Sequence, residues 1–327
     1  MQTATGIIAP KNFFLINKEY LAVEGRVIGF SLYTVRPSDN APIQLAPRGS
    51  NTSDLQHLVQ NPRLSHFFID KAETQEFQGF MTSSMTTLIE DDNIPLPQKS
   101  QVLYGRAKDI MRDVLENPRS GDSIKRATGM ADNIIDLAMK NFDAIPTMLK
   151  LGSRDYYTFS HCVNVTIFAV GFSMMIDNSG ESELRELATG CILHDVGKSE
   201  IDLQILNKPG RLNPYEFEQI KTHSEKGYHL MQGYLSKTAL EVILHHHEQA
   251  DGKGYPHGLK EHEIPDYVKI ATIADVYDAL TTVRPYSDAR PPFTALALMK
   301  KQMTGHFAQE KFIDFIRFLG GQFEKPM

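Results

Sequence analysis

The chain has 327 residues, more than one compact domain usually holds, so we expect two domains. Apolar residues make up 41% of the sequence, which is enough for real cores. The formal net charge of -6 argues against a protein that binds DNA or RNA polymers, because a polyanionic partner favours a basic surface. Residues 1–14 lack a cationic region before an apolar core, and no run reaches the roughly 18 apolar residues of a membrane span, so we expect a cytoplasmic protein.

Residues 1–92 are predicted to form a small α/β domain. Short runs of β-branched and aromatic residues predict strands at 13–16, 27–34 and 65–70, and residues 54–60 predict a helix. The region has no cluster of catalytic residue types, so a regulatory role and a structural capping role both stay open. Regulation could involve a signalling protein that binds this domain.

Residues 93–144 are predicted to be connector helices. Apolar residues recur at helical spacing over 96–116, and the stretch 117–121, which contains Pro and Gly, ends that pattern. A second helix is expected over 123–140. The apolar stripe of the first helix either packs on the chain's own core or pairs with a second copy, so a homodimer through this helix stays open.

Every element predicted after residue 145 is a helix. Residues 213–216 are a clear helix start, with a capping Asn, Pro at the first position and Glu three residues after the cap. We expect this helix to carry His223. A further helix is predicted over 268–281, and a last one is opened by two prolines and ended by two glycines over 291–321.

Three adjacent histidines, at 245–247, follow an apolar-periodic helix predicted over 236–244 and precede a glycine-rich turn at 251–254. Neighbours on a helix lie about 100° apart, so at most an adjacent pair can converge on one site. We predict that this pair is His246 and His247. The alternative is a solvated histidine-rich helix end.

His194 and Asp195 form an adjacent pair inside the apolar helical run 188–198. Burying both without partners would be costly, because a charged or polar group loses its water. A metal ion would remove that cost. The pair therefore favours a metal site over a solvated helix end for the histidine triplet, because two separate segments now carry residues that can bind a metal ion.

Five motifs in this order resemble those of the HD-GYP family of metal-dependent cyclic-dinucleotide phosphodiesterases, a branch of the HD superfamily. The motifs are Asp155–His161, His194-Asp195 with Gly197-Lys198, Lys221-Thr222-His223 with Gly227-Tyr228, Gly254-Tyr255-Pro256, and Ile273–Leu280 with Arg284-Pro285-Tyr286. The resemblance implies a mainly α protein, in which an all-helical HD-type metal-binding bundle over 145–327 follows the α/β domain and the connector helix. It also implies bacterial second-messenger signalling.

Together with the pair His246 and His247, the motifs supply five imidazoles and two carboxylates as metal ligands. They are His161, His194, Asp195, His223, His246, His247 and Asp275. This set exceeds one coordination sphere, and two ions that share Asp195 would account for it. His161, His194 and Asp275 would then serve mainly one ion, and His223, His246 and His247 the other. Asp278, three residues after Asp275, is expected to be a supporting partner.

Two metal ions about 3.5–4 Å apart can hold a hydroxide between them and neutralise the phosphate of a diester. Mixed imidazole and carboxylate ligands suit iron, manganese or nickel. The resemblance favours two iron ions, with manganese as second choice. Some family members place a glutamate where this chain has Tyr157 and use it for a third metal, so Tyr157 favours a two-metal site.

Substrate contacts are expected from Lys198, Tyr255 and Arg284. Lys198 lies one helical turn after His194 and can offer an ammonium to a phosphate oxygen, so we assign catalytic roles to Asp195 and Lys198. By resemblance, Tyr255 would present a hydroxyl or a stacking face, and Arg284 would clamp phosphate or guanine. Each has a structural alternative, namely a solvated lysine, a tyrosine that wedges its loop and an arginine that ties its loop down.

The resemblance implies a phosphodiesterase that hydrolyses cyclic di-GMP to linear pGpG, with further hydrolysis to GMP left open. One alternative is hydrolysis of another cyclic dinucleotide, such as cyclic GMP-AMP. The other is a sensor that binds a cyclic dinucleotide or a partner protein without turnover. Gln249 and Ser287 stand where basic residues often occur in the family, which leaves the base preference open.

Overall fold

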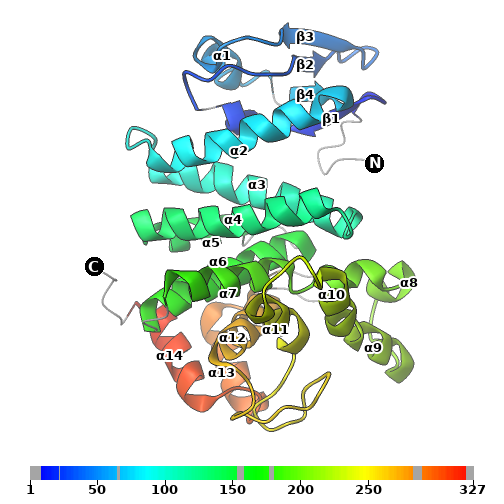
Figure 1. Cartoon of the computed structure of the whole chain (residues 1–327), viewed down its shortest axis with the longest axis vertical. Helices are drawn as coiled ribbons and strands as arrows, with labels where there is room; N and C mark the ends of the chain where they lie inside the picture. The colour runs from blue at the N-terminus through cyan, green and yellow to red at the C-terminus, as the bar shows by residue number, and fades with distance from the viewer. Residues whose placement is uncertain are drawn as a thin grey trace. The chain divides into compact units, whose positions relative to one another are not determined.

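The computed structural model describes residues 9–21, 23–64, 67–152, 158–176, 180–282 and 289–321. The chain divides into two compact units, residues 1–105 and 106–327. Helices dominate the fold, and a small four-stranded sheet lies near the N-terminus (Figure 1). The mainly α fold class predicted from the sequence is therefore confirmed.

The N-terminal unit is built on an antiparallel sheet with strand order β1-β4-β2-β3. The element bounds are β1 Phe13–Ile16, η1 Lys18–Leu21, β2 Leu32–Val35, β3 Pro42–Ala46, α1 Thr52–Val59, β4 Phe67–Asp70, η2 Lys71–Glu73 and α2 Thr74–Glu90. Strand β4 is central, which suits its run of buried Phe67, Phe68 and Ile69. The strand predicted at 13–16 is confirmed, whereas the one predicted at 27–34 begins only at Leu32.

Helix α2 was not predicted, yet it carries much of this unit's core. Phe77, Phe80, Met81 and Met85 recur at helical spacing and are buried. The ring of Phe77 packs against the ring of Phe30, with centroids 5.5 Å apart. The helical spacing was present in the sequence, but the threonines, serines and Gly79 of this stretch lower its helix propensity.

From residue 96 onward every named element in the described part of the chain is a helix, as predicted. The bounds are α3 Leu96–Glu116, α4 Gly121–Lys140, α5 Ala144–Gly152, α6 Thr158–Ile176, α7 Glu181–Leu193, η3 Val196–Glu200, α8 Leu203–Leu206, α9 Pro214–Lys221, α10 His223–Met231, α11 Lys237–His245, α12 Asp266–Thr281, α13 Pro292–Gln302 and α14 Gln309–Leu319. Helix α3 has the bounds that its apolar spacing predicts, and it contains the boundary between the units at Gly105.

Helix α6 is the core helix of the C-terminal unit. It packs against α5, α7, α12 and α14, and every residue from Ser160 to Ser173 is buried (Figure 1). Its length and composition would also suffice to cross a membrane, although polar side chains interrupt its apolar run. Because 78% of that stretch is buried inside the structure, its apolar character is explained by packing.

Two helix predictions need correction. The last helix, expected over 291–321, is two helices, α13 and α14, separated by a turn in which Gly305 has a φ of 83°. The helix that starts after Asn213 ends at Lys221, so His223 opens a separate helix, α10. The predicted capping box is present, since Asn213 and Glu216 exchange side-chain to backbone hydrogen bonds of 2.8 Å.

The aromatic core around α14 should contribute strongly to the stability of the C-terminal unit. Phe315 is fully buried, and its ring lies 5.1 Å from that of Phe172 and 5.2 Å from that of Tyr277. Phe315→Ala should destabilise the metal-depleted protein by about 3–5 kcal/mol, because it leaves a cavity. Phe293, which is 84% exposed, is the control, and Phe293→Ala should stay within about 0.5 kcal/mol of wild type in urea denaturation. Equal losses in both variants would contradict this packing.

Candidate metal centre

All seven predicted ligands lie in described parts of the chain, and the fold brings them together. Six of them form two groups, in each of which the ligand atoms lie within 4.8 Å of one another. The first group is His161, His194 and Asp195, and the second is His223, His246 and His247. Asp275 lies beside both, with Oδ1 2.9 Å from His161 Nε2 and Oδ2 3.7 Å from His247 Nδ1.

The ligands converge because most of them stand at helix ends. His194 caps the C-terminus of α7, His223 opens α10 and His246 caps the C-terminus of α11. His161 and Asp275 instead face inward from the buried helices α6 and α12. Helix α11 ends at His245, so His246 and His247 follow it directly and precede the glycine-rich loop.

Asp195 occupies the centre of the arrangement. Its Oδ2 lies 3.4 Å from His194 Nε2, and its Oδ1 lies 3.4 Å from His223 Nε2. The two carboxylate oxygens therefore face different groups. Oδ1 is buried and accepts no hydrogen bond, which is costly for a carboxylate. A positive ion beside it would remove that cost, so the residues fit a metal centre.

Three of the histidines are fixed in the same way. The Nδ1 atoms of His194, His223 and His246 lie 2.7, 2.7 and 2.9 Å from the backbone carbonyl three residues earlier. A carbonyl can only accept a hydrogen bond, so each Nδ1 carries the proton and each Nε2 keeps its lone pair. This is the form that binds a metal ion, and the Nε2 of His194 is buried without a partner.

His161 is oriented by Asp278, which the sequence had suggested as a supporting partner. Its Nδ1 donates to Asp278 Oδ2 over 2.7 Å. The other oxygen of Asp278 accepts from Asn164 Nδ2 and Thr282 Oγ1, each over 3.0 Å. With both oxygens engaged, Asp278 holds the imidazole in place and directs His161 Nε2 towards Asp275.

Charge and burial set the protonation of these groups. Burial alone would raise the pKa of Asp195, but the Lys198 ammonium and the nearby imidazoles outweigh it and hold that pKa well below its usual value. Burial lowers the pKa of His223 to about 4 and that of His247 to about 3. The Asp195 carboxylate is thus ionised, and His223 and His247 are neutral near pH 7, as metal binding requires.

Two predicted substrate residues border the groups. Lys198 Nζ lies 2.5 Å from Asp195 Oδ2, and the side chain is 19% exposed. The ring of Tyr255 lies over that of His247, with centroids 4.7 Å apart and planes inclined by 31°. The preceding Gly254 fits only without a side chain, because a Cβ there would come within 2.4 Å of the Glu248 Cα.

Other predicted residues fall outside the described part of the chain. Arg284 and Ser287 belong to residues 283–288, and Tyr157 belongs to residues 153–157. The roles expected for Arg284 as a phosphate or guanine clamp, and for Tyr157 in limiting the number of metals, therefore stay predictions.

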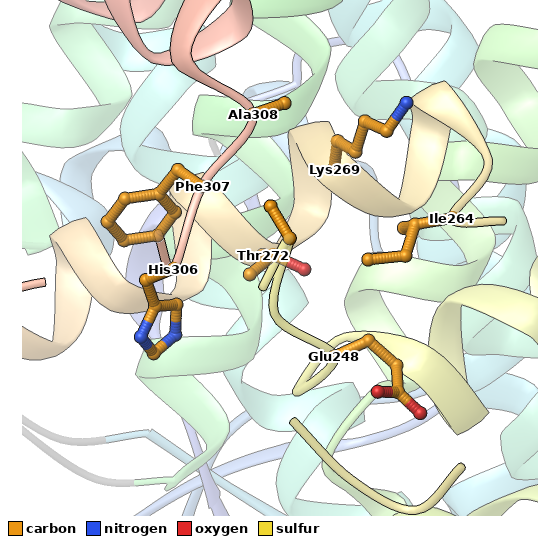
Figure 2. A pocket seen from close by; sticks show the side chains of 8 residues that line it. Glu248, Ile264, Lys269, Thr272, His306, Phe307 and Ala308 are labelled. Carbon is orange, nitrogen blue, oxygen red and sulfur yellow. The ribbon is translucent and has the colours of Figure 1, made fainter. Parts of the chain in front are cut away.

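Sequence reasoning missed Glu248, which fixes the loop that carries Tyr255. Its carboxylate accepts backbone N–H bonds from His257, Gly258 and Leu259 over 2.7 to 3.1 Å. A small pocket of about 10 Å³ is lined by Glu248, Thr272 of α12 and His306, among other residues (Figure 2). That volume holds about one water, so this pocket is no ligand site.

Comparisons with known proteins agree with this geometry. Residues 172–310 match the HD domain family. The chain is 31% identical over 223 residues to the cyclic di-GMP phosphodiesterase PA4108 of Pseudomonas aeruginosa, which covers 67% of this chain and 53% of that protein. It is 29% identical over 241 residues to the 3'3'-cGAMP-specific phosphodiesterase 3 of Vibrio cholerae, which covers 69% of this chain and 52% of that protein. The chain thus spans about half the length of these curated relatives.

A solved structure has the same fold along most of the chain. Bd1817, described as an HDG"Y"P protein from Bdellovibrio bacteriovorus, superimposes with a TM-score of 0.69 at 19% identity over 94% of this chain and 100% of that one. The helical bundle and its histidine and aspartate groups define an HD-domain protein. With its Gly254-Tyr255-Pro256 triplet, the chain belongs to the HD-GYP family.

The two ligand groups predict about two metal ions per chain, because seven converging ligands exceed one coordination sphere. Asp195→Ala should lose most of the metal, since it removes the carboxylate that faces both groups. Asp122→Ala, at an exposed aspartate, should keep both ions. Elemental analysis after anaerobic, metal-replete purification measures this, and one ion or fewer in the wild type would contradict a two-metal centre.

Proposed function

We propose that this chain is a metal-dependent phosphodiesterase that hydrolyses cyclic di-GMP to linear pGpG. The observation that carries the proposal is the position of Asp195, with one oxygen towards each histidine group. A single carboxylate between two ligand groups suits a two-metal hydrolytic site, because it can serve both ions. The names of the relatives support a cyclic dinucleotide as substrate.

When bound, two metal ions would supply positive charge to the phosphate and lower the pKa of water. His161, His194 and Asp275 would hold one ion, His223, His246 and His247 the other, and Asp195 both. Imidazoles and carboxylates, with no thiolate in either group, suit iron, manganese or nickel, and the family resemblance favours iron first and manganese second.

Lys198 and Tyr255 would act on the substrate side of the centre. The Lys198 ammonium contacts Asp195 and remains partly exposed, so it can exchange part of that contact for a phosphate oxygen. Tyr255 covers one face of His247 and would bound the space where a substrate lies. Arg284 is proposed as a further phosphate or guanine contact.

Cyclic GMP-AMP is the second candidate substrate, because the Vibrio cholerae relative named for it matches this chain at nearly the same identity and coverage as the cyclic di-GMP enzyme. A sensor without turnover is the third. The buried, unpartnered atoms of His194 and Asp195 favour a metal enzyme over such a sensor. Incubation of the metal-loaded protein with cyclic di-GMP, cyclic GMP-AMP and cyclic di-AMP, followed by chromatography of the products, separates the three.

Lys198→Ala should keep both metal ions but lower kcat by about 10²–10³-fold, because it removes one donor to the phosphate. Lys237→Ala, at a lysine whose side chain is 88% exposed, should turn over as wild type. Metal content and product formation are measured on the same preparations. Wild-type turnover by Lys198→Ala would remove Lys198 from the mechanism.

We further propose that residues 1–92 modulate the activity of residues 145–327 through the connector helices at 93–144, in a cytoplasmic protein. Modulation can act within one chain, through a homodimer of the connector helix or through a signalling partner. Deletion of residues 1–95 should leave metal content and hydrolysis in place while it changes kcat or KM, as steady-state kinetics would show. A folded truncation that binds no metal would place the N-terminal region in the centre itself.

A further inference from the structure

Helix α9 is firmly anchored but packs little. All eight of its residues are described and none is buried. The capping box starts the helix, and Lys208 Nζ lies 2.6 Å from Glu216 Oε2. Both of its aromatic side chains are nevertheless exposed to solvent, Tyr215 by 69% and Phe217 by 48%. Core packing therefore does not explain why this helix carries aromatic residues.

Phe217 belongs to a row of neighbouring side chains that ends at His247, in the second group of predicted metal ligands. Lys221 Nζ lies 4.9 Å from the ring centroid of Phe217 and 5.7 Å from that of Tyr255. The Tyr255 ring in turn lies 4.7 Å from that of His247, a predicted metal ligand. An exposed aromatic face, an ammonium and a second aromatic ring thus follow one another from α9 to the centre.

The ammonium of Lys221 is available to a ligand. Its partner is Glu218, three residues earlier on the same helix, with Oε1 2.7 Å from Nζ. The Glu218 side chain is 65% exposed, and exposed ion pairs of this kind contribute little. A ligand atom that accepts a hydrogen bond can replace the carboxylate at low cost. By contrast, Tyr215 has no ring or cation contact among the described residues.

We propose that Phe217 and Lys221 form a subsite for one guanine base of the substrate, an inference that rests on the proposed function. Phe217 stacks on the face of the base, because every base offers a π-face to an aromatic ring. Lys221 donates to O6 and N7 of guanine, which are both acceptors. Adenine presents an N6 amine donor in place of O6, so Lys221 disfavours it.

The test uses the full-length, metal-loaded protein. Lys221→Met keeps the side-chain length and removes the charge, and Phe217→Leu removes the stacking ring. Each should weaken cyclic di-GMP about tenfold, both in KM and in equilibrium binding measured without turnover. Lys221→Met should not weaken the affinity for cyclic di-AMP. Metal content, kcat and hydrolysis of bis(p-nitrophenyl) phosphate, which has no purine base, should stay at wild-type values.

Tyr215→Leu is the matched control, since it removes an exposed aromatic ring from the same helix, and its affinity for cyclic di-GMP should be that of wild type. Unchanged affinity in both Lys221→Met and Phe217→Leu would overturn the subsite. A parallel loss on bis(p-nitrophenyl) phosphate would also overturn it, because the effect would then reach the metal groups through Tyr255. If the wild type and the variants bind cyclic di-GMP with these relative affinities but the wild type never cleaves it, the proposed function is refuted while the subsite stays supported.

Discussion

A buried carboxylate with an unpartnered oxygen is the constraint on which the C-terminal unit depends. Asp195 is 1% exposed and lies among imidazoles whose lone pairs point inward. Such a group is expensive to bury unless positive charge compensates it. Lys198 supplies part of that charge at one oxygen, while the other faces His223 without a donor. The helices of the unit hold Asp195 and the surrounding imidazoles together in this buried position.

To hold these side chains together, the helices approach one another closely at two glycines. A Cβ on Gly197 would lie 1.9 Å from the carbonyl oxygen of His223, so η3 meets α10 without intervening side chains. A Cβ on Gly190 would lie 2.6 Å from the Cβ of Val242, where α7 crosses α11. Because α7, α10 and α11 end or begin at ligands, these contacts set the distance between Asp195 and the second histidine group.

Much of this could be predicted from the sequence. Apolar spacing defines α3, and the capping chemistry at Asn213 defines the start of α9. The angle between neighbours on a helix limited the triplet to one adjacent pair, and the glycine turn favoured His246 and His247. His245 lies towards Glu248, with Nδ1 3.8 Å from Oε1. Helix α2 was missed because its spacing is masked by residues of low helix propensity. The contacts of Glu248 could not be predicted, since its partners are backbone groups nine to eleven residues away.

The contacts that orient His247 differ from those of the other predicted histidine ligands, and they connect His247 to the loop that carries Tyr255. His194, His223 and His246 are each held by the backbone carbonyl three residues earlier, and His161 is held by Asp278. His247 instead packs its ring against Tyr255. The next residue, Glu248, clamps the far side of the same loop through three backbone N–H groups. A predicted metal ligand, His247, and a predicted substrate contact, Tyr255, therefore depend on the same loop. A displacement of this loop would act on His247 both through the Tyr255 ring and through its neighbour Glu248.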